Sequence, residues 1–548
     1  MRSAAHQDPT PITTSVMSSA DEGYTVSGII RRYAAERPDG EMLVCGGERR
    51  TWAQQLRRSS QVAHALQAEG LGKGDRVAFL DHNDLAFFDF LFGGSLIGAV
   101  NVAVNWRLAA PELDAVINDA QAPLLVVHRD YLPTVSELSS RLPHVRRIVV
   151  LDGGSTNDGR CCSYDQWLSD RPSEDPGFSG RPQDISMQLY TSGTTGLPKG
   201  VMLSNANLAA AIGEAGRNLI RVDDRTVSLV AMPLFHISGS LWALFAMSRG
   251  GRSVIVRDMD PVELLRLVAA ERVTETLFVP AVLMMLLATP QIAATDLSSL
   301  RNILYGASPI SEEVLAECIK RFPCQFIQVY GMTETTGPIT ALQPEDHDPS
   351  GPRRHLLRSA GKPYESVELR VVLPESGEPA AVGQVGEVVT QSGLNMVGYW
   401  QQPDETTKVI DGDGWLRSGD AGYLDEAGYL FLYDRVKDMI VTGGENVYPA
   451  EVENALLAHP ALVDAAVIGV PDDRWGEAVK AVVVLASGEL RESAPPEAII
   501  AFCHQRLAGY KCPKTVDYVD ALPRNPSGKL LKRELRAPYW LGQDRNIG

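Results

Sequence analysis

The sequence has few of the features that mark disulfide-stapled, zinc-binding or nucleic-acid-binding proteins. Seven cysteines occur in 548 residues, and none belongs to a Cys-x-x-Cys pair. A disulfide or zinc framework is therefore excluded, and a reducing, cytoplasmic location is expected. Lys and Arg together number 51 against 68 Asp and Glu, which gives a net charge of −17. Because nucleic acids and anionic membranes are bound through Lys and Arg, neither is an expected partner.

A secretory signal and a long uninterrupted apolar run are also missing. Residues 1–22 contain no apolar core of the signal-peptide kind and are predicted to form a disordered leader. Two apolar stretches stand out, at 91–104 and 229–247; the first is too short to cross a bilayer, and the second carries Pro233 and His236. Both are predicted to be buried core of an α/β protein, and no integral membrane segment is expected.

Strand-like and helix-like patterns alternate through the first 330 residues, which predicts parallel βαβ units in two successive runs. The predicted strands are 75–80, 123–127, 185–190, 228–232, 253–257, 276–279, 302–305 and 325–329. The predicted helices are 26–36, 52–69, 85–99, 112–120, 207–218, 261–271 and 312–322. A loop rich in proline, 171–184, separates the two runs.

The pattern changes twice in the remaining chain. Between 351 and 431, short β-type runs alternate with Gly and Pro turns, which predicts a small antiparallel barrel. After Tyr433 a separate α+β domain is predicted, with helices at 450–458 and 496–507 and strands at 463–470, 478–485 and 515–519. The expected fold is thus α/β, with two α/β subdomains and a barrel in residues 23–434 and a mobile α+β lid domain in 435–548.

The segment most informative about chemistry is YTSGTTGLPKG, residues 190–200. A strand runs into a loop dense in glycines and hydroxyls that ends in one lysine. Glycines let backbone N–H groups approach an anion, hydroxyls add donors, and lysine adds charge, so the loop is predicted to cradle phosphates. It is not a Walker A loop, because Pro198-Lys199-Gly200 stands where Gly-Lys-Ser/Thr would be required. A P-loop kinase or ATPase is therefore disfavoured.

Together with six further motifs, this loop resembles the adenylate-forming enzymes, which include acyl-CoA synthetases, peptide-synthetase adenylation domains and luciferases. The resemblance covers residues 26 to 536. The other motifs are MPLFHISG (232–239), YGAS (305–308), YGMTETTG (330–337), GWLRSGDAGYLDEAGYL (414–430), DRVKDMIVTGGENVYPAEVE (434–453) and NPSGKLLKREL (525–535).

The resemblance implies an ATP site built from these motifs. Tyr330 would stack on adenine, Thr333 would contact the α-phosphate, and Glu334 would bind the Mg²⁺ that bridges phosphates. Lys529 would neutralise charge that develops on the α-phosphate, so the implied catalytic residues are Lys529, Thr333 and Glu334. Further implied ATP contacts are Thr191, Ser192, Gly193, Thr194, Thr195, Gly196, Lys199, Gly306, Ala307, Ser308, Asp420 and Arg435. Asp420 and Arg435 would hold the ribose, although in isolation Asp420 would be read as part of an Asx turn.

The same resemblance places the acyl pocket around His236, with Ile237, Ser238, Gly331, Met332 and Ile339 as further lining residues. Amino-acid-activating relatives have an Asp at the position of His236, and its absence here argues against an amino-acid substrate. The pocket segments are apolar and offer no Arg or Lys for a second carboxylate. A medium- or long-chain fatty acid is favoured, while aryl and alicyclic acids stay open.

The implied reaction uses ATP, Mg²⁺ and CoA to form an acyl-adenylate and then acyl-CoA, with release of AMP and pyrophosphate. Lys437 would be the hinge of the lid domain, Gly443 and Gly444 would line the pantetheine path, and Trp475 and Lys511 would touch CoA. An acyl-AMP ligase that loads a carrier protein, or a luciferase-like oxygenase, would share the first half-reaction. A homodimer is left open.

Overall fold

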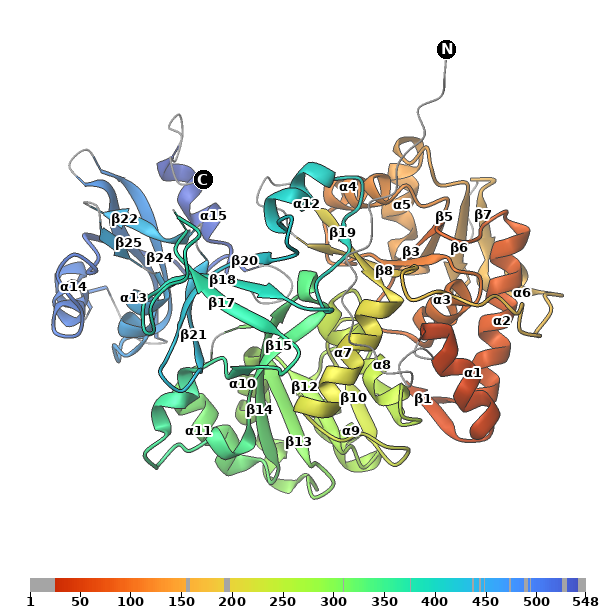
Figure 1. Cartoon of the computed structure of the whole chain (residues 1–548), viewed down its shortest axis with the longest axis horizontal. Coiled ribbons are helices and arrows are strands. Elements are labelled where there is room, and N and C mark those ends of the chain that lie inside the picture. The colour runs from red at the N-terminus through yellow and green to blue at the C-terminus, as the bar shows by residue number, and fades with distance from the viewer. Residues whose placement is uncertain are drawn as a thin grey trace, which may run out of the picture.

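The computed structural model describes residues 25–540 apart from 154–157, 192–197, 309, 375, 436–437, 443–444, 448, 473–474, 487–490, 493 and 525–529. The predicted leader, 1–22, lies outside the described residues. The expected α/β architecture is confirmed, with successive lobes from the N-terminal subdomain at one end to the C-terminal domain at the other (Figure 1).

The first subdomain is an eight-stranded sheet with the order β19-β9-β8-β4-β3-β5-β6-β7. Strands β3 to β8 are parallel to their neighbours, whereas β9 and β19 add an antiparallel edge. The bounds are β3 Arg76–Leu80, β4 Val100–Ala103, β5 Leu124–His128, β6 Arg147–Leu151, β7 Cys161–Ser163, β8 Ile185–Thr191, β9 Lys199–Ser204 and β19 Gly398–Tyr399. Its edge strand β19 thus comes from a segment about 200 residues downstream of β9.

A nine-stranded sheet with the order β16-β15-β14-β13-β12-β10-β11-β1-β2 forms the second subdomain. Its parallel centre consists of β1 Glu41–Cys45, β10 Val227–Val230, β11 Arg252–Ile255, β12 Glu275–Phe278, β13 Asn302–Gly306 and β14 Gln325–Met332. Antiparallel strands complete its edges: β2 Glu48–Thr51, β15 Gly337–Leu342 and β16 Lys362–Pro363. Strand β1 precedes the whole first sheet in the chain yet pairs with β11, so the two subdomains are interwoven.

Helices surround both sheets and include two that are buried nearly all round. These two are α3 Leu85–Ser95 and α8 Ile237–Met247, in which only Ser238 is not fully buried. The others are α1 Val26–Glu36, α2 Trp52–Ala68, α4 Ala110–Ala120, α5 Leu132–Leu138, α6 Tyr164–Leu168, α7 Asn205–Asn218, α9 Pro261–Ala270, α10 Pro280–Ala288, α11 Glu312–Arg321 and α12 Pro403–Val409. Both apolar stretches of the sequence are therefore core, as predicted. Among the described residues, no helix combines the length and apolarity needed to cross a bilayer.

One predicted helix is shorter than expected. The apolar pattern suggested a helix over 85–99, but α3 ends at Ser95 and the strand β4 begins at Val100. Gly98 lies between them with φ of +76°, a left-handed conformation that ends a helix readily. All four residues of β4 are buried, so the strand shows no alternation that would have revealed it in the sequence.

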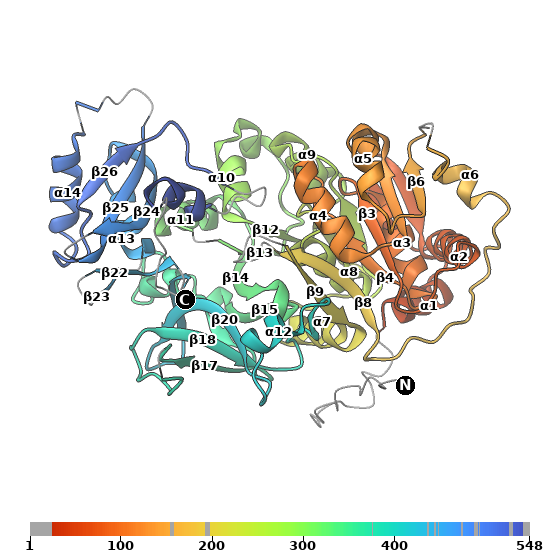
Figure 2. The same ribbon diagram turned by 90° about the horizontal axis from the view of Figure 1, so that it is seen from above.

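The segment predicted as a small barrel is an antiparallel half-barrel with the order β17-β18-β20-β21. Its strands are β17 Glu368–Val372, β18 Gly386–Gln391, β20 Leu416–Leu424 and β21 Leu430–Arg435. It lies beside the second subdomain and leads into the C-terminal domain (Figure 2).

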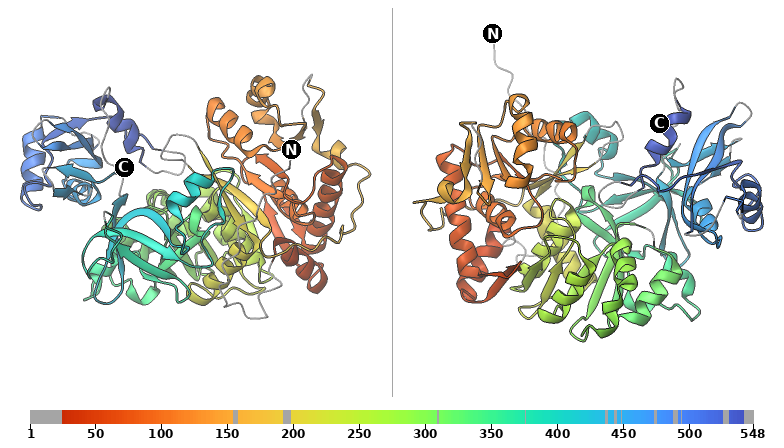
Figure 3. Two further views of the ribbon diagram at one scale, coloured as in Figure 1. Left: turned by 45° about the horizontal axis from the view of Figure 1, so that its top comes forward. Right: turned by 180° about the vertical axis from the view of Figure 1, so that it is seen from behind.

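The C-terminal domain is α+β, as predicted, and stands as a lobe of its own (Figure 3). Its strands are β22 Ile440–Thr442, β23 Glu445–Val447, β24 Leu462–Asp472, β25 Gly476–Leu485 and β26 Thr515–Tyr518, and its helices are α13 Pro449–Leu457, α14 Pro496–His504 and α15 Lys532–Arg536. Apolar side chains on both faces of its sheet form two separate clusters, distinct from the cores of the other subdomains.

Candidate active site

The predicted ATP-site residues converge from both large sheets and the half-barrel. Thr191 ends β8 in the first sheet, and its hydroxyl donates to Oε1 of Glu334 at 3.4 Å. Glu334 follows β14 of the second sheet in a short 3₁₀ turn. In sheets built from parallel strands, ligands bind beyond the carboxyl ends, and these residues lie at such ends.

The predicted adenine and ribose residues are joined by a hydrogen bond. The Tyr330 hydroxyl donates to Oδ2 of Asp420 at 2.8 Å, although 90 residues separate them in the chain. Asp420 lies in β20 and is paired in register with Arg435 of β21. The half-barrel thereby brings a half-buried carboxylate to the end of β14. Asp420 is thus a strand residue and not part of an isolated turn.

Two glycines in the predicted nucleotide motifs are required by close backbone packing. A Cβ on Gly306 would come within 2.1 Å of the carbonyl oxygen of Val329, and one on Gly331 within 2.0 Å of that of Gly337. Next to Gly306, Ala307 has φ of +66°, a conformation that L-residues adopt at a cost of order 1–3 kcal/mol. The exposed Ala307 and the half-buried Ser308 therefore form a constrained backbone turn at the carboxyl end of β13.

Glu334 is a buried carboxylate, only 7% exposed, and no basic side chain among the described residues is paired with it. Its Oε1 accepts hydrogen bonds from Thr191 and, at 3.1 Å, from the Tyr399 hydroxyl. Its neighbour Thr333 is half-buried at the start of the same turn. No group of three or more His, Cys, Asp or Glu side chains suited to a metal ion occurs in the described part of the chain.

Lys199, predicted to face phosphates, is 7% exposed and already paired. Its Nζ lies 2.5 Å from Oε2 of Glu405 on α12 and 4.8 Å from the ring centroid of Tyr399. Lys199 and Lys408, through their hydrogen bonds, lower the pKa of Glu405 to about 2. In this structure the lysine thus anchors the end of the Gly-rich segment to α12.

His236 is held as a neutral imidazole in the predicted acyl pocket. Burial, and then the positive charge of Arg107, lower its pKa to about 4. Its Nε2 is buried with no hydrogen-bond partner in the described residues, so a polar group of a substrate could pair with it. Phe235 packs against its ring, with centroids 4.6 Å apart. Of the other predicted lining residues, Ile237 and Ile339 are buried, whereas Ser238, Gly331 and Met332 are half-buried.

Arg107 is a basic residue near His236 that lies outside the motifs from which the pocket was predicted. It follows β4 in the first sheet, more than 120 residues before His236. Its positive charge contributes to the low pKa of His236, whereas the expectation that the pocket segments offer no Arg or Lys for a second carboxylate stays a prediction. Desolvation by burial lowers the pKa of Arg107 itself. Trp106, the residue before Arg107, packs edge-on against Phe235 with ring centroids 6.4 Å apart, and this tertiary contact brings Arg107 near His236.

The predicted CoA residues lie in the C-terminal domain. Trp475 is 42% exposed, and Nζ of Lys511 lies 2.7 Å and 2.8 Å from the two carboxylate oxygens of Glu451. The remaining predicted residues lie outside the described residues: Ser192, Gly193, Thr194, Thr195, Gly196, Lys437, Gly443, Gly444 and Lys529. The side chain of Arg435 is not described either.

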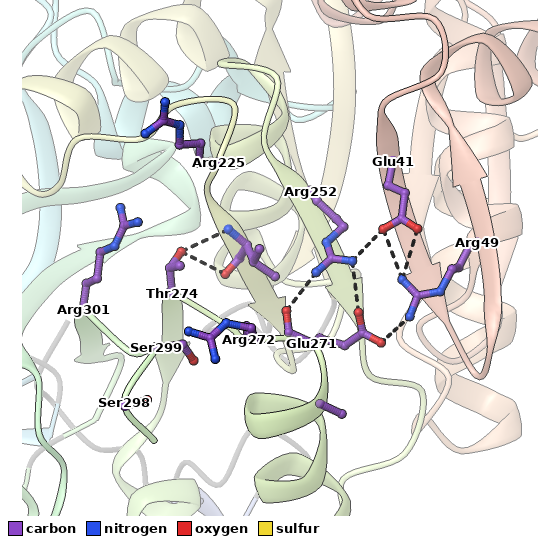
Figure 4. A pocket seen from close by; sticks show the side chains of 12 residues that line it. Glu41, Arg49, Arg225, Arg252, Glu271, Arg272, Thr274, Ser298, Ser299 and Arg301 are labelled. Carbon is purple, nitrogen blue, oxygen red and sulfur yellow. Dashed lines mark hydrogen bonds and ion pairs between the residues drawn. The ribbon is translucent and has the colours of Figure 1, made fainter. Parts of the chain in front are cut away.

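A cavity of about 760 Å³ lies at the opposite, amino ends of β10 to β13 (Figure 4). Glu41, Arg49, Arg252 and Glu271 form a closed ring of ion pairs in its wall, at 2.5–3.1 Å. Arg252 also donates to the carbonyl of Glu271 at the end of α9, where the helix dipole favours a cation. Arg49 and Arg252 are thus accounted for by structural contacts, while Arg225, Arg272 and Arg301 complete the basic lining of the cavity.

Comparison with known proteins identifies the family. The AMP-binding enzyme family matches residues 30–400, and the AMP-binding enzyme C-terminal domain matches residues 451–529. The fatty acid–[acyl-carrier-protein] ligase ScoC of Streptomyces coeruleorubidus is 39% identical over 525 residues, 94% of this chain and 96% of that protein. A feruloyl-CoA synthase of Amycolatopsis sp is 37% identical, with 93% and 98% covered.

The structural comparison gives the same result. The crystal structure of the anthranilate CoA ligase AuaEII in complex with anthranoyl-AMP superposes with a TM-score of 0.85 at 26% identity, covering 96% of this chain and 99% of that one. The chain therefore belongs to the AMP-binding enzymes, the adenylate-forming family, and within it to the acid–thiol ligases of acyl-CoA synthetase type.

Proposed function

We propose that the protein activates an apolar carboxylic acid with ATP and transfers the acyl group to CoA. In the first step the carboxylate oxygen attacks the α-phosphorus, the bond to the bridging oxygen breaks, and pyrophosphate leaves. In the second step the CoA thiol, losing its proton, attacks the acyl carbon, and AMP leaves with the electron pair of the mixed anhydride. Both steps conserve atoms and need no redox partner.

The observation that carries this proposal is the meeting of Tyr330, Asp420 and Glu334 at one site. A phenol ring that can stack on adenine is joined to a carboxylate that can accept from vicinal ribose hydroxyls. A second carboxylate stands four residues beyond Tyr330, where the phosphates of the same nucleotide would extend. Three groups suited to base, sugar and metal-bound phosphate therefore occupy one edge of the fold.

In this proposal the remaining motif residues act by positioning and by electrostatics. Thr333 would donate to the α-phosphate. Lys529 would approach from the lid domain and neutralise charge as the phosphorus is attacked. Lys199 would add its positive charge to the field around the phosphates while it stays paired with Glu405.

The chain fits a divalent metal at Glu334. The Oε1 atom of Glu334 accepts hydrogen bonds from the hydroxyls of Thr191 and Tyr399, whereas its Oε2 atom accepts none from any described residue. A buried carboxylate without a basic partner is expensive unless a cation approaches it. When bound, Mg²⁺ would screen the negative charge of the phosphates.

The acid is proposed to be a medium- or long-chain fatty acid. The wall formed by α8 is apolar, and the neutral His236 can pair with an oxygen of the substrate without a charge mismatch. The fatty-acid activity in the name of ScoC supports this choice, whereas the feruloyl-CoA synthase supports an aryl acid as the alternative.

The boundary between the N-terminal region and the lid domain is also part of the proposal. We place the boundary between residues 434 and 435, with Lys437 as the pivot of the lid domain. Asp438 is bound to Arg536 of α15 at 2.8 Å, both side chains being mostly buried, which supports assigning residues from 438 onward to the lid. Rotation about 437 would exchange Lys529 for the segment 443–444 at the acyl-adenylate.

A panel of carboxylic acids, scored by AMP release with and without CoA, tests the proposal. A fatty acid should give CoA-dependent turnover and an acyl-CoA product by mass spectrometry. Formation of acyl-AMP that CoA never consumes would reject the CoA acceptor and favour a carrier protein, as the name of ScoC suggests. ADP as the product would reject adenylation altogether.

A further inference from the structure

A two-residue strand places a tyrosine beside the predicted metal ligand. Strand β19 pairs Tyr399 with Val201 of β9, the strand that leaves the Gly-rich segment. The same segment is fixed by backbone bonds from Met396 to the carbonyl of Glu334, at 2.8 Å, and from Trp400 to that of Gly200, at 2.7 Å. This short segment therefore bridges the two sheets where the ATP-site residues meet.

The Tyr399 side chain is buried, 7% exposed, and its hydroxyl donates to Oε1 of Glu334 at 3.1 Å. Because the hydroxyls of Tyr399 and Thr191 both donate to Oε1, they fix the rotation of the Glu334 carboxylate. The other oxygen, Oε2, receives no hydrogen bond from the described residues, so it keeps its lone pairs for a cation. Hydrogen-bonded partners of a metal ligand tune its affinity in this way.

A charged side chain holds the tyrosine in turn. Lys199 lies 4.8 Å from the ring centroid of Tyr399 and is bound to Glu405 at 2.5 Å. The backbone N–H of Tyr399 donates to the hydroxyl of Thr406, the residue after Glu405, at 2.9 Å. Helix α12 therefore fixes Tyr399 through its backbone and through the lysine above its ring.

We propose that Tyr399 is a positioning residue that orients Glu334 for the divalent metal of the ATP complex, with the Lys199–Glu405 pair holding Tyr399 in place. This inference rests on the proposed function, because it takes Glu334 as the metal ligand. It assigns a role to β19 and α12, which lie outside the predicted catalytic motifs.

Binding of α,β-methylene-ATP to the full-length protein tests the inference without turnover. The dissociation constant is measured in EDTA and over a Mg²⁺ titration. For Tyr399→Phe we expect an unchanged constant in EDTA and a Mg²⁺ requirement raised about 10-fold, the lower end of the range for loss of such a partner. Glu405→Gln should shift the Mg²⁺ requirement in the same direction.

Two variants serve as matched controls. Tyr364 is buried and its hydroxyl has no hydrogen-bond partner in the described residues, so Tyr364→Phe removes a hydroxyl without removing a contact. Lys408→Gln breaks the other ion pair of Glu405 and spares Lys199. Both should bind the analogue with the wild-type Mg²⁺ requirement.

Three results would overturn the inference. A Tyr399→Phe protein with the wild-type Mg²⁺ requirement would show that the hydroxyl does not orient Glu334. Equal weakening in EDTA and in Mg²⁺ would indicate general damage to the ATP site. If wild-type protein bound the analogue no better with Mg²⁺ than in EDTA, the metal assignment of the proposed function would fail together with this inference. The first result, in contrast, would overturn the role of Tyr399 alone.

Discussion

Removal of the Asp420 carboxylate should weaken ATP binding while leaving CoA binding nearly unchanged. Asp420 is half-buried, and it is already oriented by the Tyr330 hydroxyl at 2.8 Å, so little freedom is lost when ribose binds. Truncating one side of a desolvated, charge-assisted pair costs on the order of 2–5 kcal/mol. Since 1.4 kcal/mol is about tenfold, Asp420→Ala should raise the ATP dissociation constant by about 30-fold to several thousand-fold.

The assay is direct binding of ATP, together with the KM of each substrate in the adenylation reaction. Tyr330→Phe keeps the ring but removes the hydroxyl that orients Asp420, and we expect a loss of about 1 kcal/mol, or about fivefold. Tyr364→Phe removes a buried hydroxyl that has no hydrogen-bond partner among the described residues, and this variant should bind ATP as the wild type does. Unaltered ATP affinity in Asp420→Ala would refute the ribose assignment.

Three further outcomes are expected. Lys529→Ala should abolish most acyl-AMP formation but spare thioester formation from supplied acyl-AMP, because its charge is needed only while phosphorus is attacked; an equal loss in both half-reactions would contradict this role. Lys437→Pro should leave adenylation largely intact and slow transfer to CoA, since proline fixes φ near −65° at the proposed pivot, and Gly444→Leu should also slow transfer by filling the pantetheine path. Single-turnover rates of each half-reaction test both, and wild-type transfer rates in both variants would reject the rotation. Finally, because His236 has a pKa of about 4 when folded and about 6.5 when unfolded, the unfolded chain binds the extra proton between these values. Stability should therefore fall by up to about 3 kcal/mol as the pH drops from 6.5 to 4, and urea unfolding of His236→Gln should lack this part of the pH dependence.

The helices and strands that the sequence predicted have local signals, whereas strands such as β1, β6 and β9 and helix α10 were not predicted. Helix α1 matches the predicted bounds, and α2, α9 and α11 differ by one residue, since apolar spacing and capping act within a few residues. The end of α3 and the strand β4 were missed, because a fully buried apolar run carries no period that separates helix from strand.

Within the candidate site, the motifs supplied the residue types and the fold supplied the partners. Tyr330, Glu334 and Asp420 were assigned to ATP because their motifs resemble those of the adenylate-forming enzymes, and these roles stay predictions. The hydrogen bonds of Tyr399, the pairing of Lys199 with Glu405 and the charge of Arg107 beside His236 were not found. Tyr399 and Glu334 are 65 positions apart, Lys199 and Glu405 are 206 apart, and Arg107 and His236 are 129 apart, and no local pattern marks such pairs.

The sequence by itself thus determined the class of protein and the chemistry, because separated motifs carry the reactive groups whatever their spacing in the chain. Tertiary structure alone decided which of these groups meet. Pairing of β1 with β11 interweaves the subdomains, and pairing of β19 with β9 brings the Tyr399 hydroxyl within hydrogen-bond distance of Glu334. Strand pairing depends on the whole set of competing edges, so these contacts are fixed only when the sheets assemble.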